Sequence, residues 1–272
     1  MPEITFVTIR CSTLMEYFQV FPKQKLKLEW QAFWLSVGFL TRIPMLVRID
    51  YSQRLMNQSS LYFPLVGLLL GAFYALTYGL LALAFSSVVA IILVVILHLF
   101  VTGAFHEDGL ADSIDALGGG YTVEKRLAIM KDSRIGTYGA AALTMALLLK
   151  VTLLAEADTI WLALLVAPSI SRLTPLLLMA TLNYVTDASN SKSKPVADGF
   201  SRQRLLVAVG FTLMVAAAMS FWHPLLFAGA LSAVILTAFC WGAYLRQQLG
   251  GYTGDALGAS VILSELVLLL FL

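Results

Sequence analysis

Long apolar stretches separated by polar connections dominate the chain, and their length is typical of helices that cross a membrane. A transmembrane helix needs about 20 mostly apolar residues. Seven stretches come close to this length. An eighth, shorter stretch at 33–47 contains Arg42 and Pro44, which favours a re-entrant or interfacial helix. The pattern predicts an all-α integral membrane protein, a bundle of about seven transmembrane helices plus that short N-terminal helix. The seven expected spans are 61–84, 88–105, 138–154, 159–181, 205–221, 225–244 and 256–272.

The composition also favours a membrane environment. Of the 272 residues, 59% are hydrophobic and 12% are charged, and the mean hydropathy is +0.84. Soluble domains carry roughly 25% charged residues, because they need a solvated surface around one core. Residues 1–32 mix charges into modest apolar runs and lack the pattern of a signal peptide. We therefore predict an interfacial extension over 1–32 and one polytopic membrane domain over 33–272.

The basic residues predict which side of the membrane each connection faces. Lys and Arg concentrate in cytoplasmic loops of membrane proteins. If the N-terminus is inside and seven spans follow, the outer connections 85–87, 155–158 and 222–224 contain neither Lys nor Arg. Sixteen of the 18 basic residues then lie on the inner side, and only Lys150 and Arg172 fall within spans. The longer connections are also on the inner side, so we expect the working face to be cytoplasmic.

An acidic cluster follows the second expected span. The segment 106–115 reads HEDGLADSID, and on a continuous helix Asp108, Asp112 and Asp115 lie within about 60° of one another. Carboxylates at this spacing repel, and hard divalent cations prefer oxygen ligands. The alternative is a solvated acidic stripe, which would normally include Lys or Arg. None occurs between Phe105 and Glu124, so we favour a metal site.

The next segment combines cations, hydroxyls and glycines. Thr122 is expected to cap a short helix, and the sequence KDSRIGTYG follows that helix at 131–139. Lys131, Ser133 and Arg134 are suited to phosphate oxygens. The alternative is a basic juxtamembrane segment that meets anionic lipid. Beside the acidic cluster, we favour phosphate binding.

Other polar residues stand out near the inner face. Arg172 lies within a span, where a cation needs a partner, so it is either a ligand for an anionic group or pairs with Glu265 or Asp255. The segment 250–258, GGYTGDALG, offers Thr253 and Asp255 at the same depth as the acidic cluster; the alternative is a glycine turn capped by Asp255. We expect Lys150 to extend toward the outer membrane surface and His98 to pack or hydrogen-bond between helices. Lys194 lies in a basic inner loop and is a further candidate contact for a substrate.

These segments together resemble the bacterial cobalamin synthase family, the adenosylcobinamide-GDP ribazoletransferases of vitamin B12 nucleotide-loop assembly. The resemblance covers residues from about 33 to 272. It implies a magnesium-dependent membrane transferase that joins adenosylcobinamide-GDP to α-ribazole or its 5′-phosphate and releases GMP. It rests on the motifs FLTRIP (39–44), YFPLVGLLLG (62–71), HEDGLADSIDA (106–116), RLAIMKDSRIGTYG (126–139), Ser-Arg (171–172) and GGYTGDALGA (250–259).

The resemblance also implies roles for the candidate residues. Magnesium is expected to be held by Asp108, Asp112, Asp115 and Asp255, with Asp115 as the general base. Asp112, Lys131 and Arg134 are expected to complete the catalytic set. The expected substrate contacts are His106, Ser133, Arg172, Lys194 and Thr253. The implied location is the bacterial inner membrane with a cytoplasmic active face, with no nucleic acid involved. Homo-oligomers or association with other B12-assembly enzymes are compatible with this reading.

Two other functions are compatible with parts of the pattern. Membrane CDP-alcohol phosphotransferases also carry aspartate-rich helices, but this chain has Ala111-Asp112 where that family has Ala-Arg. A secondary transporter would use intramembrane charges, but midplane charge is scarce and no inverted repeat is visible. Both are less well supported than the transferase.

Overall fold

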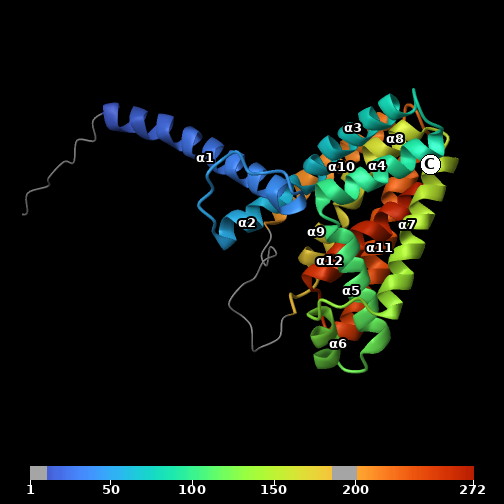
Figure 1. Cartoon of the computed structure of the whole chain (residues 1–272). Helices are drawn as coiled ribbons and strands as arrows, with labels where there is room; N and C mark the ends of the chain where they lie inside the picture. The colour runs from blue at the N-terminus through green and yellow to red at the C-terminus, as the bar shows by residue number, and fades with distance from the viewer. Residues whose placement is uncertain (1–10, 186–200) are drawn as a thin grey trace, which may run out of the picture.

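The computed structural model describes residues 11–185 and 201–272, and nearly all of this part of the chain is helical (Figure 1). One isolated bridge pairs Tyr184 with Tyr252. The all-α, multi-pass class expected from the sequence is confirmed. The elements are α1 (Cys11–Leu40), α2 (Gln53–Ser59), η1 (Ser60–Tyr62), α3 (Phe63–Leu81), α4 (Ser87–Thr102), α5 (Phe105–Gly119), α6 (Val123–Met130), α7 (Thr137–Glu156), α8 (Ile160–Ser171), α9 (Thr174–Thr181), α10 (Arg202–Met219), α11 (Leu226–Leu249) and α12 (Gly254–Leu269).

The number of spans is smaller than the seven expected. Within the described residues, five helical segments are long and apolar enough to cross a membrane, and a sixth is added if α4 and α5 form one broken span. The α4–α5 pair bends by 86°. Helix α12 has 16 residues, about 24 Å at 1.5 Å per residue, which is less than the roughly 30 Å of a hydrocarbon core. Hydropathy finds apolar stretches but does not detect where they bend or how far the helix extends.

The expected short helix over 33–47 is wrong. Its first part belongs to α1, a single helix that runs through to Leu40, and the chain then continues without helix until Gln53. Pro44 disfavours helical geometry at the residue before it, and the Thr41 hydroxyl accepts a hydrogen bond from Ile43 N at 3.2 Å. Figure 1 shows α1 extending away from the bundle, with α2 folded beside it. The expected boundary between residues 32 and 33 thus lies inside one helix.

Helices α3 and α8 pack closely because glycines line their interface. A Cβ on Gly67 would collide with the Pro168 carbonyl, and one on Gly71 would collide with the Leu165 carbonyl. Small residues four apart allow such close backbone approach in membrane helices. Ser169 Oγ also donates a hydrogen bond to the Pro64 carbonyl at 2.8 Å. The GLLLG part of the 62–71 motif therefore positions α8 against α3.

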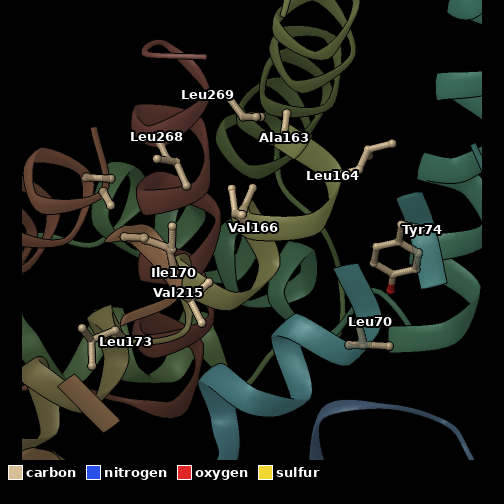
Figure 2. Packing of buried hydrophobic residues seen from close by; sticks show 14 of the residues in the cluster. Leu70, Tyr74, Ala163, Leu164, Val166, Ile170, Leu173, Val215, Leu268 and Leu269 are labelled. Atoms are coloured by element: carbon tan, nitrogen blue, oxygen red, sulfur yellow. The ribbon is translucent and has the colours of Figure 1, made fainter. Parts of the chain in front are cut away.

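The hydrophobic core forms around this helix pair. Figure 2 shows side chains from α3, α8, α10 and α12 gathered in one cluster, among them Leu70, Val166, Ile170, Val215 and Leu268. Each of these side chains is at most 6% exposed. Many other apolar side chains, such as Leu83 and Phe239, remain exposed, as expected where lipid replaces water.

Two helix breaks bring polar residues into the bundle. Between α4 and α5, Gly103 and Ala104 adopt left-handed backbone conformations, with φ of 67° and 55°. The chain can therefore turn sharply and direct the acidic helix α5 along α12. The second break falls between α8 and α9 at Arg172, with Pro175 in the first turn of α9.

Candidate active site

The acidic face expected from the sequence lies where α5 packs against the start of α12. Gly109 makes this contact possible, since a Cβ there would lie 2.7 Å from the Asp255 carbonyl oxygen. Asp108, Asp112 and Asp255 therefore come together from two helices. Electrostatic repulsion acts on Asp112 from Asp108, Asp255 and Asp115, and on Asp255 from Asp108.

Asp115 has a different structural role from Asp108 and Asp112. Its Oδ2 accepts a hydrogen bond from Gly136 N at 2.6 Å, and its Oδ1 accepts one from Gly139 N at 2.8 Å. These backbone amides belong to the start of α7, where N–H groups have no partner within the helix. Both carboxylate oxygens of Asp115 are thus used to hold the 131–139 segment against α5. Asp115 therefore has a structural role at the start of α7, and its expected roles as general base and metal ligand stay predictions.

The basic segment between α6 and α7 lies beside the acidic face. Thr122 caps α6 as expected, since its hydroxyl accepts a hydrogen bond from Lys125 N at 3.3 Å. Lys131 ends α6, and Ser133 is exposed. Arg134 is engaged by Asp132, with Nη2 2.6 Å from Oδ2 and Nε 3.0 Å from Oδ1. The Arg134 guanidinium lowers the pKa of Asp132 to about 2, so this exposed pair stays charged at physiological pH.

Thr253 and Asp255 have different structural roles at the start of α12. Thr253 is the N-cap, and its hydroxyl accepts a hydrogen bond from Ala256 N at 3.2 Å and lies 3.5 Å from Met130 Sδ. The hydroxyl expected to contact substrate is therefore used within the protein. The alternative in which Asp255 caps the helix is wrong, and its carboxylate lies in the first helical turn beside α5. Lys194 lies outside the described residues.

A buried polar network lies beneath the acidic face. His98 makes the interhelical contacts expected of it: Nδ1 is 3.1 Å from the Tyr74 hydroxyl, and Nε2 is 3.1 Å from Oε1 of Glu107. Glu107 is 2% exposed and precedes Asp108 directly. The His98–Glu107 contact joins α4 to α5 across their bend. No local sequence pattern indicates this role for Glu107, because the two residues are nine positions apart across a helix break.

Lys150 and Glu265 form a second buried pair. The expectation that Lys150 extends toward the outer membrane surface is wrong: its side chain is 7% exposed, and Nζ lies 2.9 Å from Oε2 of Glu265. This pairing also argues against the alternative in which Glu265 is the ion-pair partner of Arg172. No hydrogen bond or ion pair of the described residues joins Arg172 to Asp255 either.

Arg172 is almost fully enclosed. It is 1% exposed, and its Nη1 donates a hydrogen bond to the Pro168 carbonyl at 2.7 Å. Nε and Nη2 find no partner among the described residues. The guanidinium lines a small cavity together with His106, which is 3% exposed, and with Gly254 at the start of α12. The structure therefore brings Arg172 and His106 together below the acidic face, and their contact with substrate stays a prediction.

The carboxylates of the acidic face are a possible donor set for a magnesium ion. In the part of the chain that the structure describes, no three His, Cys, Asp or Glu side chains are arranged to hold a metal. Magnesium is commonly bound by one or two carboxylates, with waters and substrate phosphates completing its octahedron. Asp108 and Asp255, with Asp112 beside them, meet that requirement in chemistry and in number.

These features define a multi-pass helical membrane protein with an acidic site between two helices. Residues 32–272 match the family model described as CobS, cobalamin-5-phosphate synthase, and the chain belongs to this family. The match begins close to residue 33, where the resemblance in sequence was expected to start. No solved structure matches the chain.

Curated relatives are similar over nearly their whole length. A Vibrio parahaemolyticus adenosylcobinamide-GDP ribazoletransferase is 43% identical over 91% of this chain and 93% of its own length. A Vibrio cholerae protein of the same name is 43% identical over 91% of this chain and 95% of its own. A Shewanella pealeana protein, also of that name, is 43% identical over 88% of this chain and 93% of its own.

Proposed function

We propose that this protein is a magnesium-dependent adenosylcobinamide-GDP ribazoletransferase. It joins adenosylcobinamide-GDP to α-ribazole or its 5′-phosphate, and releases GMP with adenosylcobalamin or its phosphate. Family membership over residues 32–272 supports the reaction class. The observation that carries the assignment to a site is the convergence of Asp108, Asp112 and Asp255 from α5 and α12 beside a basic segment.

The reaction requires control of negative charge. The acceptor hydroxyl attacks the phosphorus that carries the cobinamide, a new P–O bond forms, and the anhydride bond to GMP breaks. Negative charge develops on the phosphate oxygens, which are already negative and repel the nearby carboxylates. Neutralising that negative charge is therefore the main task of the site. Bound magnesium supplies that neutralisation, and Asp108 and Asp255 are the residues we assign to hold it.

The acceptor hydroxyl also loses a proton. We assign the proton acceptor to Asp112 in place of Asp115, because both oxygens of Asp115 accept hydrogen bonds from Gly136 and Gly139. Asp112 is partly exposed on the same face of α5 as Asp108. A general base within hydrogen-bond reach typically contributes 10²–10⁴-fold to a rate. Asp115 then acts by holding the 131–139 segment at the site.

The basic segment provides groups for phosphate oxygens. Lys131, Ser133 and Arg134 lie on the connection that Asp115 holds beside α5. Arg134 is paired with Asp132 in this structure, so phosphate binding by Arg134 involves exchange of one anion for another. Such exchange is feasible because the pair is exposed and exposed ion pairs are weak. Lys194 lies outside the described residues and stays a predicted substrate contact because it belongs to a basic loop.

We place the site at the cytoplasmic face of the bacterial inner membrane. The bias of Lys and Arg to one side of the spans supports this orientation. Helix α6 and its flanking connections carry Lys125, Arg126, Lys131 and Arg134, and they lie beside the acidic face.

A reconstitution experiment tests the proposal. The purified protein in detergent or nanodiscs is given adenosylcobinamide-GDP, radiolabelled α-ribazole and Mg²⁺. We expect stoichiometric formation of GMP and labelled adenosylcobalamin, both lost in excess EDTA and restored by added Mg²⁺. Failure to form either product, in a sample shown to be folded, would refute the function. Uptake of a substrate into sealed vesicles without GMP release would favour a transporter.

A further inference from the structure

A small cavity lies beneath the acidic face, enclosed by residues of α1, α3, α5 and α12 and by the break between α8 and α9. Its volume is about 30 Å³. Most of its wall is apolar, including Phe39, Phe63 and Phe105. Its polar lining comes from the Arg172 guanidinium and the His106 ring, near Gly254 at the N-terminus of α12. One water-sized group needs roughly 10–15 Å³, so the cavity has room for two or three oxygen atoms.

Arg172 is left with unused donors in this cavity. Nη1 is bonded to the Pro168 carbonyl, whereas Nε and Nη2 find no partner within the described residues. A buried charge without hydrogen-bond partners is strongly unfavourable. No nearby carboxylate hydrogen-bonds the guanidinium: Glu265 pairs with Lys150, Oε1 of Glu107 contacts His98, and Oε2 of Glu107 has no hydrogen-bond partner within the described residues. Lys150 and Glu265 line a different cavity, next to Tyr74 and His98.

We infer that this cavity binds the 5′-phosphate of the acceptor, with Arg172 as the residue that distinguishes phosphorylated from unphosphorylated ribazole. Two N–H groups of one guanidinium match two oxygens of a phosphate monoester. The N-terminus of the 16-residue helix α12 adds favourable potential for an anion. The apolar walls exclude the water that would otherwise compete for these donors. The inference rests on the proposed function.

The phosphates of the two substrates would then bind at two sites, the acidic face and the cavity beneath it. The anhydride of the donor is the group that magnesium and the carboxylates of the acidic face would neutralise. A monoester on the acceptor carries its own charge and needs a separate cation. The family description names a 5-phosphate product, whereas the curated relatives are named ribazoletransferases, so both kinds of acceptor are relevant substrates. An arginine away from the acidic face provides a physical basis for preferring one of them.

Acceptor competition tests the inference. We expect wild-type protein to show a higher kcat/KM with α-ribazole 5′-phosphate than with α-ribazole. In Arg172→Lys, which keeps the charge but loses the planar fork, that ratio should fall about tenfold or more. The fall should lie mainly in KM for the phosphorylated acceptor. The matched control is Arg204→Lys, because Arg204 is bound by Glu29 at 2.7 Å between α10 and α1, and its substitution should leave the ratio unchanged.

Binding without donor gives a second readout. The phosphorylated acceptor should raise the melting temperature of wild-type protein more than α-ribazole does, and Arg172→Lys should remove that difference. The rise in melting temperature should not need the donor anhydride, so inorganic phosphate alone should reproduce part of it. An equal loss of kcat/KM for both acceptors in Arg172→Lys overturns the inference while leaving the transferase function intact. If Arg172→Lys does not fold, equal protection of wild-type protein by both acceptors overturns it.

Discussion

Nζ of Lys150 lies 2.9 Å from Oε2 of Glu265, and both side chains are less than 8% exposed. The two residues are 115 positions apart and join the middle part of α7 to α12. Because α12 also carries Asp255, this pair holds one wall of the active site against α7, to which Asp115 holds the other wall, α5. A buried charge pair inside a bundle is tolerated only when both charges are neutralised together.

Breaking the Lys150–Glu265 pair should therefore destabilise the protein. Lys150→Met leaves Glu265 buried and alone, and we expect a loss of about 3–5 kcal/mol of unfolding free energy. Thermal or denaturant unfolding in detergent measures it. The double variant Lys150→Met, Glu265→Gln should recover most of the loss, since no uncompensated charge remains. An unchanged stability in the single variant would show that the pair does not support the bundle.

Substitution of Asp108 and substitution of Asp112 should change different kinetic parameters. Asp108→Asn removes a proposed magnesium ligand, so the Mg²⁺ concentration for half-maximal activity should rise at least about tenfold. Asp112→Asn removes the proposed proton acceptor, so kcat should fall about 100-fold or more at saturating Mg²⁺. GMP release at varied Mg²⁺ measures both. Asp158→Asn, whose side chain is 83% exposed on the α7–α8 connection, is the control and should be normal. Near-normal kinetics of both test variants would show that Asp108 is not a magnesium ligand and that Asp112 is not the proton acceptor.

Asp115 should act mainly through the position of α7. Asp115→Ala removes the acceptor for Gly136 N and Gly139 N, which should destabilise the protein by about 1–3 kcal/mol. Gly139→Ala should have a similar effect while keeping the carboxylate, because its Cβ would collide with Oδ2 of Asp115. Unfolding curves and GMP release are measured in parallel. If Gly139→Ala is fully active and stable while Asp115→Ala is folded and inactive, Asp115 takes part in the chemistry itself.

The orientation can be tested with exposed positions. Tyr121, on the α5–α6 connection, is 92% exposed, and Asp158 lies on the α7–α8 connection. In a background with Cys11→Ser and Cys240→Ser, we expect Asp158→Cys to react with an impermeant thiol reagent in spheroplasts. Tyr121→Cys should react only after the membrane is permeabilised. Labelling of Tyr121→Cys in sealed cells would invert the orientation and place the active site outside.

The sequence was sufficient for the class of fold and for the family. Apolar stretch length gives membrane helices directly, because the bilayer imposes that length. Asp108 and Asp112 could be predicted as candidate site residues because they share a helix face without an intervening cation. His98 was correctly predicted to contact residues of neighbouring helices.

The tertiary structure alone decided which charged residues meet. Asp115 shares the helix face of Asp108 and Asp112, yet it holds the start of α7, because Gly136 and Gly139 come within hydrogen-bond reach only when the chain folds back. Lys150 pairs with Glu265, and Glu107 pairs with His98 across a bend of 86°. Periodicity along one helix determines which side chains share a face, because the helical repeat is local. Contacts between distant helices depend on breaks and packing, which here result from Gly67, Gly71, Gly103 and Ala104, and no local pattern encodes the partner on the other side.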